Sequence, residues 1–317
     1  MKRIFICFVI LLLAMGTVAA RTVELVLHPA KASESARRCR LLPLPSEQSD
    51  EAAAPLYEQA LKALPAGLDM NQLHEWRSAP AGQLPKEQVE QVLQQGKQAL
   101  DLLERAARCR QHDWPYLDPD TAAAGLGGYR KLVVLIALQA RLQIGQGRYD
   151  EAVETMRTGF AMAGQLGKAP TLVEGLVAIA VAAVMCSQLE QFVQEADAPN
   201  LYWALQALPR PYLDLSEQME YEDRDTKEKT RLLMNRLDRH LAALQCVEAI
   251  RLYADRHGGK LPDGLSSITE LVAPNDPVAG RPFDFRLAGT KGILEAAAPE
   301  GGSERDALRY EMVMKEQ

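Results

Sequence analysis

A long amphipathic helix is expected near the carboxyl end of this chain, over residues 226–257. Apolar residues recur there at intervals of three and four, as one buried helical face requires. The stripe consists of Leu233, Leu237, Leu241, Leu244, Val247, Ala249 and Leu252. Gly258 and Gly259 follow and permit the left-handed conformation that ends many helices. So long an apolar stripe needs a surface to pack on.

The sequence after this helix predicts that surface as a small sheet. Three strands are expected, at 283–287, 293–296 and 308–314. In the last of them apolar residues alternate with mostly polar ones, as a sheet with one buried face requires. The alternation sets Leu308, Tyr310, Met312 and Met314 against Arg309, Glu311 and Val313. We therefore expect a small α+β domain in which the long helix packs on a short antiparallel sheet.

The residues around the end of this helix carry a resemblance to a known family. They are Tyr253, Ala254, Asp255, Gly258, Leu261 and Pro262, followed by Asn275, Asp276, Pro277, Gly280, Pro282, Phe283, Phe285 and Leu287. Their order resembles the globular head of type II secretion major pseudopilins, in which an Asp-Pro-x-x-Gly-x-Pro turn starts a small antiparallel sheet. The resemblance implies a head-like domain and a role beside a secretion or pilus-like system.

Two features of those pseudopilins are missing here. The helix starts with the polar run Thr226-Lys227-Glu228-Lys229, which cannot lie in the apolar interior of a filament. The loop at 299–306 has only Glu300, Glu304 and Asp306 as carboxylates, too few for a strong calcium site. We expect a monomeric head that neither polymerises nor depends on calcium.

The region before residue 215 is predicted to be mainly helical. Apolar periodicity predicts helices over 86–110 and 132–144, and Thr171 with Glu174 has the spacing of a capping box that starts another. Between the second and third of these, Gly147, Tyr149 and Ala152 form a Gly-x-Tyr-x-x-Ala turn, with the small residue Ala140 in the preceding helix. This pattern resembles a tetratricopeptide-type helix hairpin and implies helical-repeat-like packing.

The amino terminus predicts export. Lys2 and Arg3 precede an apolar run from Ile4 to Met15, and small residues lead to Ala20. These are the three zones of a secretory signal peptide. The alternative, a retained anchor, needs about 20 apolar residues, and this run is shorter. The expected division is therefore a signal peptide at 1–20, a helical domain at 21–214, and a long helix with its sheet at 215–317.

The net charge excludes some classes of partner, and the number of cysteines limits the possible disulfides. Loss of Lys2 and Arg3 with the signal takes the formal net charge from −6 to −8, which argues against binding of nucleic acid or anionic lipid. Four cysteines remain, which permits two disulfides in an oxidising compartment, in any of three connectivities. Cys39 with Cys109 is the candidate disulfide. For Cys186 and Cys246, the alternative to a disulfide is a buried free thiol.

One loop is the best candidate for a ligand site. Acidic and aromatic residues gather there, and such a group suits a cation or a sugar, although the commoner role is to cap helices. Its members are Asp113, Trp114, Tyr116, Asp118 and Asp120. No metal-binding spacing is present: His74 and Glu75 lack the second histidine of a metalloprotease helix, and Cys109 with His112 is only half of a zinc site. We expect no cofactor.

Three functions follow in order. The first is a secreted or periplasmic, non-catalytic scaffold that binds protein or peptide through a concave apolar or aromatic groove of its helical domain. The second is an accessory component of a type II secretion or pilus-like system. The third is an enzyme of unrecognised class, for which the sequence offers no nucleophile, base or metal set.

Overall fold

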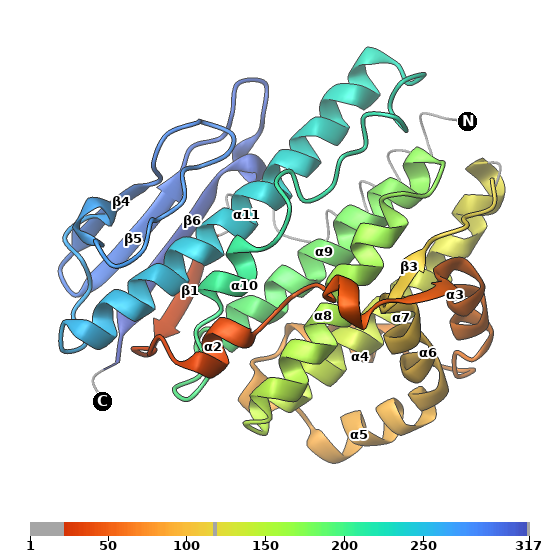
Figure 1. Ribbon diagram of the computed structural model, residues 1–317, viewed down its shortest axis with the longest axis horizontal. Helices are drawn as coiled ribbons and strands as arrows, with labels where there is room; N and C mark the ends of the chain where they lie inside the picture. Colours follow the sequence, from red (N-terminus) through yellow and green to blue (C-terminus); the bar gives the residue numbers. More distant parts are fainter. Residues whose placement is uncertain (1–21, 117–118, 316–317) are drawn as a thin grey trace. The chain divides into compact units, whose positions relative to one another are not determined.

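The computed structural model describes residues 22–116 and 119–315, and they form two compact units (Figure 1). The sheet unit combines three stretches of the chain, 22–39, 192–212 and 223–315. The helical unit consists of residues 40–191 and 213–222. The order of elements, mainly helices followed by a small mixed sheet near the carboxyl end, confirms the expected fold class.

The sheet unit is built on four strands in the order β1-β6-β5-β4. Their bounds are β1 Thr22–Leu27, β4 Asp284–Ala288, β5 Lys291–Ala296 and β6 Leu308–Met314. The three strands predicted after the long helix are confirmed. The expected antiparallel sheet is corrected to a mixed one, because β1 runs parallel to β6 while β6, β5 and β4 are antiparallel neighbours. Thr22 lies opposite Arg309, so the sheet joins the two ends of the chain.

Helix α11 (Arg224–Arg256) is the long helix predicted from the leucine stripe. Asp223 caps its first turn by accepting a hydrogen bond from the Thr226 amide at 2.9 Å. From Leu237 to Leu252 the helix is buried except at His240, which is partly exposed. His240 lies against Tyr310 of β6, with 6.2 Å between the ring centroids, so the helix packs on the sheet as expected. The unit is completed by α2 (Glu34–Arg38) and α10 (Tyr202–Gln206).

A buried polar network holds the three stretches of the sheet unit together. The Arg251 guanidinium donates to the carbonyl oxygens of His28 and Ala198, each at 3.1 Å, and to the Glu248 carboxylate at 3.0 Å. Glu248 also accepts from the Leu201 amide at 3.0 Å. Both charged side chains are fully buried. One turn of α11 therefore binds both the amino-terminal stretch and residues 192–212.

The two compact units are discontinuous in sequence, whereas the division expected from the sequence lies at 214/215. Besides the Arg251 network, β1 is held on its other side by Gln194, whose side-chain oxygen accepts from the Val26 amide at 3.1 Å. A cut at 214/215 would remove β1, its hydrogen-bond partners and α10 from the sheet they complete. Residues 215–317 alone thus lack the parts that we expect a stable sheet unit to need.

The helical unit packs seven helices and a short two-stranded sheet. Their bounds are α3 Ala53–Lys62, α4 Met70–Ser78, α5 Lys86–Gln95, α6 Lys97–Ala107, α7 Pro119–Gly145, α8 Tyr149–Leu166 and α9 Leu172–Phe192. The sheet pairs β2 (Ser49–Ala52) with β3 (Cys109–Gln111). The helix predicted over 86–110 is in fact two, because α5 ends and α6 begins at Gly96.

Helices α7 and α8 form a hairpin at the position of the tetratricopeptide-type pattern. Gly147 takes a left-handed conformation with φ +70° in the turn, where other residues are strained. Ala140 and Ala152 are fully buried. Gln143 accepts a hydrogen bond from Thr155 at 2.8 Å and so links the two helices by a polar contact. The helical architecture is compatible with a helical repeat, and the tetratricopeptide resemblance stays a prediction.

Helix α9 is the one helix in the described part of the chain that is long and apolar enough to cross a membrane. Length and composition alone are weak grounds for a span, and 67% of its most apolar window is buried in the protein. A Cβ added at Gly159 of α8 would lie 2.2 Å from Met185 Sδ of α9, so these helices approach closely. This burial and close packing are typical of a helix in the core of a protein.

Candidate functional site

The predicted ligand loop does not present its aromatic residues together. Trp114 stacks on Tyr57, with ring centroids 5.5 Å apart and planes at 13°. Its ring nitrogen donates to the Gln165 carbonyl oxygen at 2.9 Å. Asp113 is exposed with φ +43°, and Tyr116 is 76% exposed. Trp114 therefore anchors the loop, and its stacked face is not available to a ligand.

Two members of the loop add little to this picture. Asp118 lies outside the described residues, and Asp120 falls in the first turn of α7. The structural centre beside the loop is instead Gln165, which sequence reasoning missed. Its amide donates to the carbonyl oxygens of Ala106 at 2.8 Å and Cys109 at 3.0 Å, and its side-chain oxygen accepts from the Tyr57 hydroxyl.

The structure forms no disulfide among the four cysteines that it describes, and the expected pair of Cys39 with Cys109 stays a prediction. Cys39 lies in the sheet unit and Cys109 in the helical unit. The Cys39 thiol donates to the Ser35 carbonyl oxygen at 3.4 Å, and the Cys109 thiol donates to that of Arg105 at 3.5 Å. Burial raises the pKa of the Cys109 thiol, which makes it a poor nucleophile.

Two histidines of the helical unit lie beside cations. Arg130 donates to His74 Nε2 at 3.0 Å, and Lys168 Nζ lies 3.1 Å from His112 Nε2. Burial and then the Arg130 charge lower the pKa of His74 to about 4, so this ring is neutral at pH 7. Burial and Lys168 also lower the pKa of His112. Neither arrangement resembles a base oriented by a carboxylate.

Metal binding has no visible site in the part of the chain that is described. No group of three or more His, Cys, Asp or Glu side chains there is placed to hold a metal ion. The Asp306 carboxylate lies in the loop that stands at the position of the pseudopilin calcium loop, and it is used by the protein itself. It accepts from Arg236 at 2.6 Å, from the Ser303 amide at 2.8 Å and from the Ser303 hydroxyl at 3.0 Å. A guanidinium thus lies where a cation would bind.

We expect the melting temperature of the chain to be the same with calcium and with a chelator. We also expect acid to weaken the hydrogen bonds that Asp306 accepts. Burial alone would raise the pKa of Asp306, but the hydrogen bonds from Arg236 and Ser303 outweigh burial and hold the pKa below 3.8. This stabilisation is complete above that pH and is lost as pH falls through the lowered pKa. Asp306→Asn should cost about 1–3 kcal/mol at neutral pH and flatten the acid side of the stability profile.

Asp263→Asn is the matched control, because Asp263 is exposed and makes no ion pair with a described residue. Denaturant unfolding across the acid range measures both variants. A melting temperature that drops on chelation, or an acid profile that Asp306→Asn leaves unchanged, would contradict this role.

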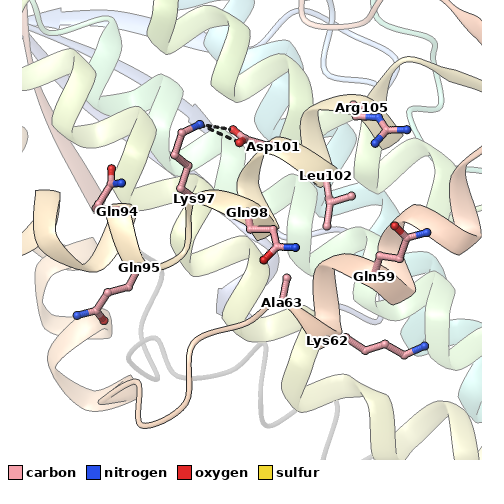
Figure 2. Close-up of a pocket in the computed structure, with 10 residues that line it drawn as sticks. All are labelled: Gln59, Lys62, Ala63, Gln94, Gln95, Lys97, Gln98, Asp101, Leu102 and Arg105. Carbon is pink, nitrogen blue, oxygen red and sulfur yellow. Dashed lines mark hydrogen bonds and ion pairs between the residues drawn. The ribbon is translucent and has the colours of Figure 1, made fainter.

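The strongest candidate site is a groove in the helical unit between α3 and the junction of α5 with α6 (Figure 2). Its volume is about 870 Å³, at the upper end of the range for ligand pockets. The lining residues are Gln59, Lys62, Ala63, Gln94, Gln95, Lys97, Gln98, Asp101, Leu102 and Arg105. Most of the lining residues are polar or charged, and only Ala63 and Leu102 are apolar residues, whereas an apolar or aromatic groove stays a prediction.

Helical spacing explains why these residues face one another. Gln98, Leu102 and Arg105 lie four and three residues apart, so α6 presents them on one side, together with Asp101. On α3 and its cap, Gln59, Lys62 and Ala63 have the same spacing. Figure 2 shows Gln98 facing Ala63, with Gln94 and Gln95 toward one end of the groove and Arg105 toward the other.

Gly96 sets the position of the α5 end of the groove. A Cβ added there would lie 3.0 Å from Leu135 Cδ1 of α7, so glycine lets the junction pack closely on that helix. Gln94 and Gln95 end α5 on one side of Gly96, and Lys97 and Gln98 begin α6 on the other. The junction thus brings three glutamine amides to one place.

The polar groups of the groove are largely unused by the protein. None of the four glutamine amides makes a hydrogen bond with a described residue, and all four side chains are exposed. Lys62 likewise has no hydrogen-bond or ion-pair partner in the described part of the chain. Lys97 pairs with Asp101 at 2.8 Å, and Arg105 with Glu51 at 2.9 Å. Both pairs are solvent-exposed, so they hold these cations weakly.

A smaller cavity of about 270 Å³ lies in the sheet unit, beside the ion pair of Arg239 with Asp276. Arg239 donates to Asp276 at 2.9 and 3.1 Å and to the Ala297 carbonyl oxygen at 2.9 Å, and both charged side chains are buried. The pair fastens the Asp-Pro-x-x-Gly-x-Pro turn to α11. Because its groups are already satisfied, this cavity is a weaker candidate than the glutamine groove.

Comparison of the chain with models of known families, with curated proteins and with solved structures finds no match.

Proposed function

We propose that this protein is an exported, non-catalytic binding protein that holds a peptide or an extended segment of another protein in the groove of its helical unit. The observation that carries the proposal is the set of four exposed glutamine amides on facing helices, none bonded to a described residue. Each amide offers two donors and an acceptor. A peptide backbone presents one donor and one acceptor per residue, so its hydrogen-bonding groups can pair with those of the glutamine side chains.

Other ligand classes fit this groove less well. The lining contains no aromatic side chain on which a nucleobase could stack. The net charge of −6 opposes nucleic acid as well. No histidine, cysteine or serine lines the groove, so it lacks the usual nucleophiles and bases of a hydrolase. Binding without reaction is the function that these side chains support best.

The test is a screen of short random peptides against the full mature chain. We expect the wild-type protein to retain a defined subset and mass spectrometry to recover those peptides uncut. Gln59→Ala combined with Gln98→Ala should abolish retention. Gln88→Ala is the matched control, since Gln88 is an exposed glutamine of α5 that does not line the groove. Retention of no peptides, cleavage of them, or an unchanged subset with the double variant would refute the proposal.

Export is the second part of the proposal, and it predicts a mature protein that begins at Arg21. The support is the order of charged, apolar and small residues before Ala20. Amino-terminal sequencing of protein from the native cell envelope or medium measures this directly. A full-length cytoplasmic protein that still begins at Met1 would contradict both the cleavage and the compartment.

An accessory role in a type II secretion or pilus-like system is the alternative. The three carboxyl-terminal strands and the helix that packs on them favour it, because they lie where the pseudopilin resemblance predicts them. In that case a partner would contact the sheet unit rather than the groove. Binding of purified pseudopilins by the full chain, lost on substitutions in β4 and kept in the groove double variant, would favour this role.

A further inference from the structure

We infer that the partner segment held in the glutamine groove is acidic: an extended peptide whose Asp or Glu carboxylates lie at the end of the groove formed by Lys62 and Arg105. This inference rests on the proposed peptide-binding function. The groove is lined by three cations and one carboxylate, whereas the whole chain carries a net charge of −6. A local reversal of sign in an acidic protein selects partners by charge.

The cations are not spread evenly along the groove. Figure 2 shows Lys62 and Arg105 at the end where Gln59 lies between them, and Gln94 and Gln95 toward the opposite end. One end therefore favours carboxylates, and the other offers neutral amides for the peptide backbone. Such a division fixes the position of an extended ligand along the groove.

Lys62 is the first expected contact. It lies in the last turn of α3, is exposed, and has no ionic partner among the residues that the structure describes. An incoming carboxylate can pair with it without displacing anything except water. Arg105 contributes in a different way, because its guanidinium can share its donors between Glu51 at 2.9 Å and a ligand oxygen.

The same geometry disfavours a basic partner. A lysine or arginine would have to approach three cations, and the carboxylates beside them are already paired, Asp101 with Lys97 at 2.8 Å and Glu51 with Arg105 at 2.9 Å. An anionic polysaccharide shares the charge of an acidic peptide but lacks the regular amide donors and acceptors that match glutamine. We therefore choose the acidic peptide and treat the polysaccharide as an outcome of the test.

The experiment uses fluorescence anisotropy with the full mature chain. The probe is a labelled peptide of alternating Glu, Ala and Gly, compared with versions in which Gln or Lys replaces each Glu. Oligogalacturonate serves as a non-peptide polyanion competitor. We expect the Glu peptide to bind, the Gln peptide to bind at least several-fold more weakly, and the Lys peptide not to bind. Added salt should weaken the Glu peptide most.

Variants locate the effect. Lys62→Glu should weaken the Glu peptide about tenfold, equivalent to about 1.4 kcal/mol, and strengthen the Lys peptide. Lys86→Glu is the matched control, because Lys86 is an exposed lysine of α5 outside the groove and should leave affinity unchanged. Circular dichroism of both variants verifies folding.

The possible outcomes distinguish the preference for acidic peptides from peptide binding itself. Equal binding of the Glu and Gln peptides, or no response to Lys62→Glu, would overturn the acidic preference and leave peptide binding intact. Binding of oligogalacturonate in place of every peptide would overturn both, as would the failure of the random-peptide screen. Tenfold weakening with Lys62→Glu and none with Lys86→Glu would support the acidic segment.

Discussion

Arg251→Leu is expected to lower the free energy of unfolding of the sheet unit by about 3–5 kcal/mol, the usual cost of removing one partner from a buried ion pair. Glu248 would then remain fully buried without its guanidinium. The carbonyl oxygens of His28 and Ala198 would also lose their donor. Burial already raises the pKa of Glu248, and without Arg251 the carboxyl must take up a proton or stay uncompensated.

Denaturant unfolding measures the loss, and hydrogen exchange identifies the segments that open. Exchange should rise together in 22–39, 192–212 and the end of α11, because Arg251 joins all three. Arg256→Leu is the control: it lies in the last turn of the same helix, is exposed, and should change stability by less than about 0.5 kcal/mol. A loss below about 1 kcal/mol, or opening of α11 alone, would contradict the discontinuous unit.

Gln165→Leu is the second large effect, with an expected loss of about 2–4 kcal/mol in the helical unit. The substitution leaves the carbonyl oxygens of Ala106 and Cys109 and the Tyr57 hydroxyl without their buried partner. Each unsatisfied buried group costs about 1–3 kcal/mol, although local rearrangement recovers part of the sum. Leucine also cannot replace the amide that joins α6, β3 and α3 to α8.

Denaturant unfolding with tryptophan fluorescence measures this variant. Trp114 bonds to the backbone oxygen of Gln165, so that contact survives the substitution and reports whether the loop stays in place. Gln88→Leu, at an exposed position of α5, should change stability by less than about 0.5 kcal/mol. A Gln165→Leu protein as stable as wild type would show that Gln165 does not anchor this region.

The elements that could be predicted from sequence are those with local patterns. The leucine stripe predicted α11 to within two residues at each end, and alternation predicted β4 to β6, because periodicity records which face is buried. The pairing of Thr22 with Arg309 could not be predicted from any such pattern in the sequence. Val23, Leu25 and Leu27 alternate with other residues in the sequence, but that alternation does not identify β6 as the strand that pairs with this segment.

The candidate site likewise depends on tertiary contacts that sequence patterns do not show. Acidic and aromatic residues near Trp114 suggested a ligand loop, yet sequence could not reveal that this indole packs on Tyr57. The glutamine groove did leave a signal, the spacing of Gln98, Leu102 and Arg105 on the polar side of the stretch 86–110. The apolar periodicity of this stretch predicts only its buried face, and it does not reveal the break between α5 and α6 at Gly96.

The most direct test of the peptide-binding role is hydrogen exchange of the full mature chain with and without the peptides retained in the random screen. Bound peptide should slow exchange at the end of α3 and around Gly96, where the groove-lining residues lie, and leave β4 to β6 unchanged. Protection confined to β4 to β6 would contradict binding in the groove and would favour the pseudopilin-like sheet as the interaction surface.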